Sequence, residues 1–312
     1  MFPSQTASSS ALSERLDEVG SLIGGTPLYP IRNAFQHDRV KLYAKLEWHQ
    51  LGQSVKARPA FQIIHDAVHR GELHPGKRLL DASSGNTGIA YAAIGSALGV
   101  PVTICLPENA SQERKQILKA YGAEVILTSP FEATEGAQRK ARELYAERPD
   151  LYYYADQYSN PSNWQAHYFH TSREIYQQTQ GQVTHFVAGL GTTGSFTGTV
   201  RKLKEINPSI QAIALQPETA LHGLEGWKHL ETADVPAIYD ASLADNILEV
   251  DTVSAYETLK LVADTEGLLI SPSAAANLLG AMRVAEHLEE GVVVTVFADD
   301  ASKYSEVIDN LF

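Results

Sequence analysis

The chain has 312 residues, 44% of them apolar, which is enough for one large or two modest globular cores. Its formal net charge of -12 argues against nucleic acid or an anionic membrane as the main partner, although a local basic pocket could still bind a small anion. No apolar run reaches membrane-spanning length, and the first twenty residues lack the features of a signal peptide, so we expect a mobile or lightly docked arm there.

The only cysteine, Cys105, lies in an apolar run that predicts a buried strand. A single cysteine cannot form an internal disulfide, which favours a reducing compartment, and we expect the cytoplasm.

Short β-branched runs alternate with amphipathic segments of helical length. The expected strands are residues 41–46, 77–82, 102–106, 124–128, 185–188, 211–215 and 292–297. The expected helices are residues 60–71, 87–99, 112–121, 134–147, 194–206, 254–267 and 274–287. This alternation predicts an α/β protein with mainly parallel sheets and crossover helices, and the turn-rich residues 160–163 suit a crossing between two lobes.

A loop of small residues, 83–88, lies between one of these strands and a helix. Such a junction points backbone N–H groups away from the sheet edge and favours anions. Lys56 precedes the loop by about thirty residues. Alone, this lysine would be interpreted as a solvated surface residue; opposite an anion site, its amine suggests Schiff-base chemistry on an aldehyde cofactor.

A second glycine-rich loop, residues 189–195, follows a strand and opens a helix. It matches G-x-G-x-x-G, and Glu218 follows at a strand end, so a dinucleotide site is one interpretation. The hydroxyls of Thr192, Thr193 and Ser195 suit a terminal phosphate monoester better. A purely structural turn is the third interpretation, and the loop alone leaves all three open.

Ser273 follows an apolar strand and small residues at the expected start of a helix. Without further context it would be interpreted as an N-cap serine.

Two histidine pairs, His65 with His69 and His167 with His170, have the spacing of helix-borne metal ligands. No third ligand matches either pair, so we predict no metal site and interpret the histidines as exposed or interlobe residues.

Together, Lys56, the two loops and Ser273 occur in the order and spacing of a known family. The chain resembles the fold-type II pyridoxal-phosphate enzymes, specifically the cysteine synthase and cystathionine β-synthase family, and looks closest to the cysteine synthase B branch. The resemblance extends from about Ile23 to Lys303. The stretches that carry it are residues 107–114, 121–124, 156–161, 184–187, 191–194 and 240–243.

The resemblance implies a role for each site residue. Lys56 would hold pyridoxal 5'-phosphate as a Schiff base and later accept the substrate α-proton, and Asn86 would bond the phenolic oxygen of the cofactor. The cofactor phosphate would be held by Gly191, Thr192, Thr193, Gly194 and Ser195, and Ser273 would bond the pyridine nitrogen. The substrate carboxylate would be bound by Ser83, Ser84, Gly85, Thr87 and Gln157. The alternative interpretation of Gln157 is an interlobe hydrogen bond.

The resemblance also implies an architecture and a reaction. Residues 1–48 and 161–312 would form the larger, cofactor-phosphate-binding domain, and residues 49–160 a smaller mobile domain that closes over the substrate carboxylate. The activity would be a β-replacement that converts O-acetylserine or O-phosphoserine and sulfide, or another sulfur donor, to L-cysteine through an aminoacrylate. The expected protein is a cytoplasmic homodimer that binds small molecules, and neither nucleic acid nor membranes.

Three departures from the family pattern keep alternatives open. Residues 49–52 read His-Gln-Leu-Gly where the family usually has Asn-Pro-x-Gly. Ala57 replaces a common acidic residue, and Pro272, Ala274 and Ala275 stand in a loop that is glycine-rich in the family. A different donor or nucleophile, β-elimination without replacement, or a non-catalytic relative that binds the cofactor are therefore the alternative hypotheses.

Overall fold

A computed structural model describes residues 9–83 and 85–312, which divide into two compact units. The first unit contains the described residues up to Ile23, Gln50–Gly52 and Lys56–Ser162, and the second contains Gly24–His49, Gln53–Val55 and Asn163–Phe312. The chain thus passes from one unit to the other within the turn-rich residues 160–163. The assignment of a larger domain and a mobile domain, with the boundaries given above, remains a prediction.

The first unit is built on a four-stranded sheet in which every strand pair is parallel. Its strands, in spatial order, are β5 (Glu124–Thr128), β4 (Val102–Pro107), β3 (Arg78–Ala82) and β6 (Tyr152–Tyr154). Cys105 lies on β4 opposite Ala82 and is fully buried, so its predicted position in a buried strand is confirmed.

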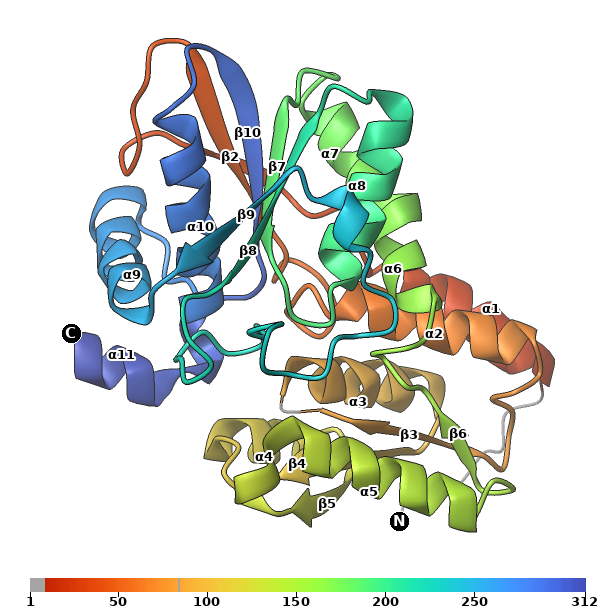
Figure 1. The fold of residues 1–312 in the computed structure, drawn as a ribbon. Helices are drawn as coiled ribbons and strands as arrows, with labels where there is room; N and C mark the ends of the chain where they lie inside the picture. Colours follow the sequence, from red (N-terminus) through yellow and green to blue (C-terminus); the bar gives the residue numbers. More distant parts are fainter. Residues whose placement is uncertain (1–8, 84) are drawn as a thin grey trace. The chain divides into compact units, whose positions relative to one another are not determined.

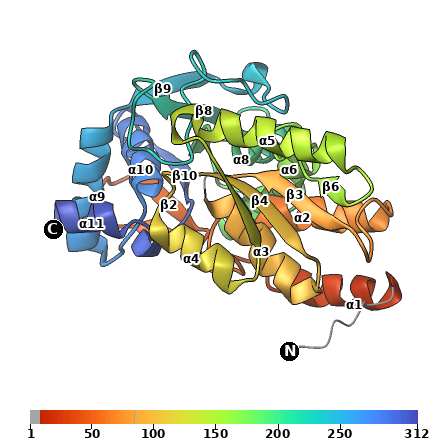
Figure 2. The same cartoon turned by 90° about the horizontal axis from the view of Figure 1, so that it is seen from below.

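Helices cover both faces of this sheet. Those packed around one core are α1 (Ser9–Gly20), α2 (Ala57–His69), α3 (Asn86–Leu98) and α4 (Gln112–Ala120). The opposite core is covered by α5 (Ala133–Glu147), and Figure 2 shows β3 and β4 between α5 on one side and α1 and α3 on the other. Crossover helices of this kind let parallel strands pair, because both faces must be buried.

The expectation of a mobile or lightly docked N-terminal arm is wrong from Ser9 onward. These residues form α1, in which Leu12, Leu16 and Val19 are buried at 6% exposure or less. Their spacing places them on one face of the helix, which packs into the core around α2 and α3. Three widely spaced apolar residues among polar ones gave too weak a pattern for the sequence analysis to predict this helix.

The second unit is built on a six-stranded sheet (Figure 1). In spatial order its strands are β1 (Leu28–Ile31), β2 (Val40–Leu46), β10 (Gly291–Phe297), β7 (His185–Gly189), β8 (Gln211–Pro217) and β9 (Asn246–Val250). Only the edge pair of β1 and β2 is antiparallel; all other pairs are parallel. The strand from the C-terminal part of the chain, β10, thus lies between strands from earlier parts.

Helices again lie on both faces of the sheet (Figure 1). One face carries α9 (Thr252–Glu266) and α10 (Pro272–Ala285), and the other carries α7 (Ser172–Gln178) and α8 (Gly194–Ile206). A short helix, α6 (Ser162–Ala166), continues through a π-helical turn (His167–Thr171) into α7, and α11 (Ser305–Leu311) is the last helix. The predicted α/β class, with mainly parallel sheets flanked by helices, is confirmed.

The residues at the ends of two helices explain where these helices stop and start. Gly122 has a φ of +77° just after α4, which confirms that the helix predicted there is ended by a glycine. Helix α10 begins at Pro272, two residues before the predicted start, because Ser271 caps it and proline suits the first helical position. No helix in residues 9–83 and 85–312 is long and apolar enough to cross a membrane.

Candidate cofactor and substrate site

Lys56 occupies the N-cap position of α2 and is half-buried. Gly52, at a φ of +81°, lies beside this helix start: a methyl group placed on it would be 3.3 Å from the Ala90 Cα and 3.8 Å from the Ala57 Cβ. A glycine therefore allows the beginnings of α2 and α3 to approach each other. Within the first unit, this close packing places the helix start that carries Lys56 beside α3, whose first residue is Asn86.

The loop before α3 is held by Ser83. Its hydroxyl oxygen accepts hydrogen bonds from the backbone N–H groups of Gly85, at 3.1 Å, and Gly88, at 3.0 Å. Ser84, also predicted to bind substrate, lies outside the described residues. A methyl group on Gly85 would be 2.9 Å from the Arg114 side chain, so a larger residue there would have to displace that side chain. Asn86 is half-buried and begins the helix at the end where N–H groups favour anions.

Gln157 joins the residues on either side of this loop. Its side-chain oxygen accepts from the Thr87 hydroxyl at 2.7 Å, and its amide nitrogen donates to the carbonyl oxygen of Ala82 at 2.7 Å. Gln157 and Thr87 are both buried, at 2% and 5% exposure. The structure therefore brings together the described residues that were predicted to bind the substrate carboxylate: Ser83, Gly85, Thr87 and Gln157.

Asp81 lies beneath this arrangement and was missed by the sequence analysis. One of its oxygens accepts from the backbone N–H of Ala82 at 2.8 Å, and the other from that of Gln157 at 3.3 Å. It is 1% exposed, and this burial raises the pKa of its carboxyl to about 8, an effect that the nearby negative charge of Asp156 reinforces. A carboxylate inside an otherwise apolar strand, two residues before the loop, was the signal that could have identified it.

In the second unit, the glycine-rich loop after β7 is tightly packed. A methyl group on Gly191 would lie 2.1 Å from the backbone oxygen of Gly226, far inside van der Waals contact. The neighbouring Leu190 accepts a backbone hydrogen bond from Lys228 at 2.7 Å and donates one to Leu215 at 2.9 Å. Gly191 is therefore required by this close approach of two backbone segments.

The end of this loop offers hydroxyl groups at the N-terminus of α8. Thr193 is the N-cap residue, with a φ of +69°, and its hydroxyl is buried without a partner among the described residues. The Thr192 hydroxyl accepts from the side-chain amide of Asn163 at 3.1 Å. An unpaired buried hydroxyl is unfavourable unless a ligand bonds it, and the adjacent helix N-terminus favours an anion. These residues therefore fit a phosphate group.

His167 is a second residue that the sequence analysis did not assign to the site. It is fully buried in the π-helical turn, with its Nε2 atom 3.2 Å from the Ser195 Oγ and its Nδ1 atom 2.9 Å from the Thr171 Oγ1. Turns of this kind occur often at functional sites. His167 is therefore not an exposed residue. Within the described residues, no cluster of three or more His, Cys, Asp or Glu could hold a metal ion.

Ser273 is the second residue of α10, and its interpretation as the N-cap is wrong. Ser271 is the N-cap, since its hydroxyl accepts from the backbone N–H of Ala274 at 3.2 Å. The Ser273 hydroxyl lies 3.2 Å from that of Ser271, and the residue is 5% exposed. Its hydroxyl is therefore not used to cap the helix, which is compatible with its predicted bond to a ring nitrogen.

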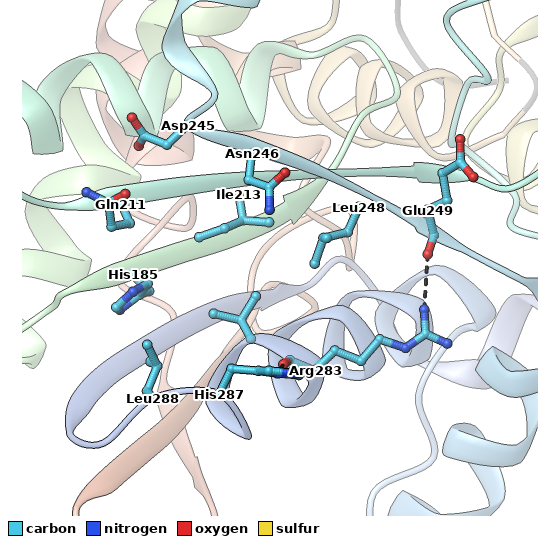
Figure 3. A pocket seen from close by; sticks show the side chains of 11 residues that line it. His185, Gln211, Ile213, Asp245, Asn246, Leu248, Glu249, Arg283, His287 and Leu288 are labelled. Carbon is cyan, nitrogen blue, oxygen red and sulfur yellow. Dashed lines mark hydrogen bonds between the residues drawn. The ribbon is translucent and has the colours of Figure 1, made fainter.

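A separate pocket lies in the second unit at the beginnings of β7, β8 and β9 and the end of α10 (Figure 3). Arg283 crosses it and donates to the backbone oxygen of Glu249 at 3.0 Å. The pocket contains none of the predicted site residues. Ligands of parallel sheets bind beyond the opposite, carboxyl ends of the strands, where the loop after β7 lies, so this pocket is not the cofactor site.

Two units with mainly parallel sheets, one with a lysine at a helix start and one with a glycine-rich loop before a helix, match the architecture expected of a fold-type II pyridoxal-phosphate enzyme. The model of the family described as "Pyridoxal-phosphate dependent enzyme" matches residues 19–299. The chain is 46% identical to a cysteine synthase of Aquifex aeolicus, covering 92% of this chain and 90% of that protein. It is 38% identical to cysteine synthase B of Escherichia coli, covering 90% and 92%.

The fold is also similar to that of solved structures. The O-acetylserine-dependent cystathionine β-synthase of Helicobacter pylori has a TM-score of 0.86 and 31% identity, covering 92% of this chain and 96% of that one. The chain therefore belongs to the family of pyridoxal-phosphate-dependent enzymes and, within it, to the cysteine synthases. The predicted family and cofactor are confirmed; the roles of individual site residues remain predictions.

Proposed function

We propose that this enzyme converts an activated serine, O-acetylserine or O-phosphoserine, and sulfide or another sulfur donor to L-cysteine. The observation that carries the proposal is the partnerless, buried Thr193 hydroxyl in a glycine loop at the start of α8, in a chain that retains Lys56 at the start of α2. The identity of 46% and 38% to cysteine synthases supports the choice of reaction.

The second unit would hold the cofactor at two places. The loop of Gly191, Thr192, Thr193, Gly194 and Ser195 would bind the phosphate through backbone N–H groups and hydroxyls, without an arginine. Ser273 would bond the pyridine nitrogen with a neutral hydroxyl. When bound, pyridoxal 5'-phosphate supplies a conjugated ring that accepts the electrons released when the substrate loses its α-proton.

The first unit would supply the amine and the substrate site. Lys56 Nζ would hold the cofactor aldehyde and, once the substrate amine has displaced it, accept the proton from the substrate α-carbon. Asn86 would orient the cofactor through its phenolic oxygen. The substrate carboxylate would lie at the start of α3, against Ser83, Ser84, Gly85 and Thr87, with Gln157 fixing the loop that holds them.

The proposal is tested by adding pyridoxal 5'-phosphate to the purified protein and recording its visible spectrum. The wild type should show the absorbance of a lysine-bound cofactor, and Lys56→Ala should lack it. O-Acetylserine or O-phosphoserine with sulfide should then yield cysteine. A wild type that stays colourless with added cofactor would overturn the proposal, and a coloured protein that is inactive with every donor and acceptor would support a non-catalytic relative.

A second candidate keeps the cofactor and the activated serine but uses another thiol as the acceptor. It is favoured by the similarity to the O-acetylserine-dependent cystathionine β-synthase and by Pro272 directly before Ser273, where the family pattern has flexible residues. Competition between sulfide and homocysteine for the same activated serine would discriminate the two candidates. Turnover with sulfide alone would exclude the second.

Two further properties are part of the proposal. The enzyme would be a cytoplasmic homodimer, and its smaller domain, residues 49–160, would close over the bound substrate carboxylate. Light scattering of the purified protein should give twice the mass of one chain. Small-angle scattering should show a more compact particle when an activated serine is added.

A further inference from the structure

Asn277 ties together three elements of the second unit. It lies on α10 one turn after Ser273 and is 4% exposed. Its side-chain oxygen accepts from the backbone N–H of Gly189 at 2.7 Å, and its side-chain nitrogen donates to the backbone oxygen of Val296 at 2.7 Å. A buried amide that satisfies both of its ends with backbone groups of other elements has one orientation.

Both hydrogen-bond partners of Asn277 lie on strands next to the glycine-rich loop. Gly189 is the last residue of β7 and the first of the glycine-rich loop, while Val296 is on β10, the strand next to β7. A methyl group on Gly189 would lie 2.0 Å from the ring of Trp227, so the start of the loop is also confined by that side chain.

The backbone of Asn277 is held as well. The Thr295 hydroxyl donates to the backbone oxygen of Val187 at 2.8 Å and lies 3.3 Å from that of Asn277. Strand β7, strand β10 and the helix that carries Ser273 are therefore connected by side-chain bonds in addition to core packing. One helical turn separates Ser273 from the amide that holds the loop.

We infer that Asn277 is a positioning residue for the cofactor: it sets the spacing between Ser273 and the phosphate loop. This inference rests on the proposed function, in which residues 191–195 bind the phosphate and Ser273 the pyridine nitrogen. The cofactor ring is rigid, so both ends can be bonded only when these two elements keep one separation. Loss of the amide would also leave the Gly189 N–H without its side-chain acceptor and release the start of the loop.

The test uses the full-length holoenzyme and the variant Asn277→Ala. The dissociation constant of pyridoxal 5'-phosphate, measured from its visible absorbance, should rise about tenfold or more. A change of this size is expected when one hydrogen bond between neutral groups is lost and its partner is left unpaired. The ³¹P resonance of the bound phosphate should shift or broaden. Leu278→Ala is the matched control on the same helix: Leu278 is fully buried, so this change lowers stability, but it should leave the phosphate resonance in place.

Asn277→Asp is the second variant, because a protonated carboxyl has the same shape and can both donate and accept. It should bind the cofactor more tightly than Asn277→Ala, and most clearly at low pH. The inference is overturned if Asn277→Ala binds the cofactor as tightly as the wild type with an unchanged ³¹P resonance, even if the variant is less stable. A wild type that binds no cofactor would instead overturn the proposed function.

Discussion

The side-chain ammonium of Lys303 donates to the backbone carbonyl oxygen of Gln53 at 2.9 Å. Lys303 is 2% exposed and also pairs with the buried carboxylate of Asp299, at 3.6 Å. The backbone N–H of Val55 donates to Ala298 at 2.7 Å. The segment after β10 therefore holds the residues immediately before Lys56, including Gln53 with its unusual φ of +50°.

Lys303→Met should lower the free energy of unfolding by roughly 1–3 kcal/mol, because it keeps the aliphatic stem but leaves the buried Asp299 carboxylate and the Gln53 carbonyl without their cation. Urea unfolding of the cofactor-free protein measures this difference. Lys260→Met, at an exposed position of α9, is the control and should have no effect. Equal stability of the two variants would show that the Lys303 bonds contribute nothing.

Thr193→Val should weaken the binding of pyridoxal 5'-phosphate about tenfold without lowering the stability of the cofactor-free protein. The Thr193 hydroxyl has no partner within the described part of the chain, so its removal breaks no bond there, whereas a bound phosphate would lose one. Titration by absorbance and urea unfolding measure the two quantities.

Two variants make this test specific. Thr193→Ser keeps the hydroxyl and should keep the affinity for the cofactor. Thr197→Val removes another buried hydroxyl that has no partner among the described residues, one turn further along α8, and should change nothing in cofactor binding. If Thr193→Val and Thr197→Val behave alike, Thr193 does not contact the phosphate.

The sequence predicted the fold class and most of the regular elements. The long strands and amphipathic helices have strong periodicity, and several bounds agree with the structure, such as those of β5 and α8. The missed strands β1, β6 and β9 are short or lie at a sheet edge with little burial, so they lack a clear alternation of apolar residues.

The residues that support the candidate site through hydrogen bonds were harder to predict than the residues expected to contact the cofactor or substrate. Lys56 and the two loops have motifs with fixed spacing, but Asp81, His167 and Asn277 act through contacts between distant segments. Asn277 bonds a residue 88 positions away, and Asp81 bonds one 76 positions away. No local pattern encodes such pairs, because they depend on strand order and on the packing of helices against sheets.

Gln157→Ala should raise the KM for the activated serine about tenfold and leave the absorbance of the bound cofactor unchanged. The change removes the two 2.7 Å bonds that hold the loop predicted to bind the substrate carboxylate. Thr87→Val, which removes the donor of one of these bonds, should have a similar effect. Steady-state kinetics measures KM, and Gln177→Ala, at an exposed position of α7, is the control. An unchanged KM for Gln157→Ala would exclude this role.

The raised pKa of the Asp81 carboxyl predicts that the stability of the protein decreases as the pH rises through neutrality. This pKa is raised from 3.8 to about 8, first by burial and also by the charge of Asp156. Burial also raises the pKa of the neighbouring Asp156 carboxyl. The other titratable groups close to Asp81 include Cys105, whose pKa burial raises to about 12, and the tyrosines Tyr91, Tyr153, Tyr154 and Tyr158, whose pKa values burial also raises. The thiol and the tyrosines remain neutral near pH 7, and the pKa of about 8 makes Asp81 a group that changes its charge near neutral pH.

The folded protein therefore holds a proton on Asp81 that the unfolded chain has released at neutral pH. Its contribution to stability is fully present below about pH 4 and is lost as the pH rises to about 8, with a slope of at most about 1.4 kcal/mol per pH unit. Asp81→Asn, which does not titrate, should flatten the decrease in stability measured by urea unfolding between pH 6 and 8. Asp264→Asn, at an exposed position of α9, should keep the wild-type slope. If wild type and Asp81→Asn lose stability in parallel over this range, the carboxyl is already ionised in the folded protein and the loop above it is held by a charged group.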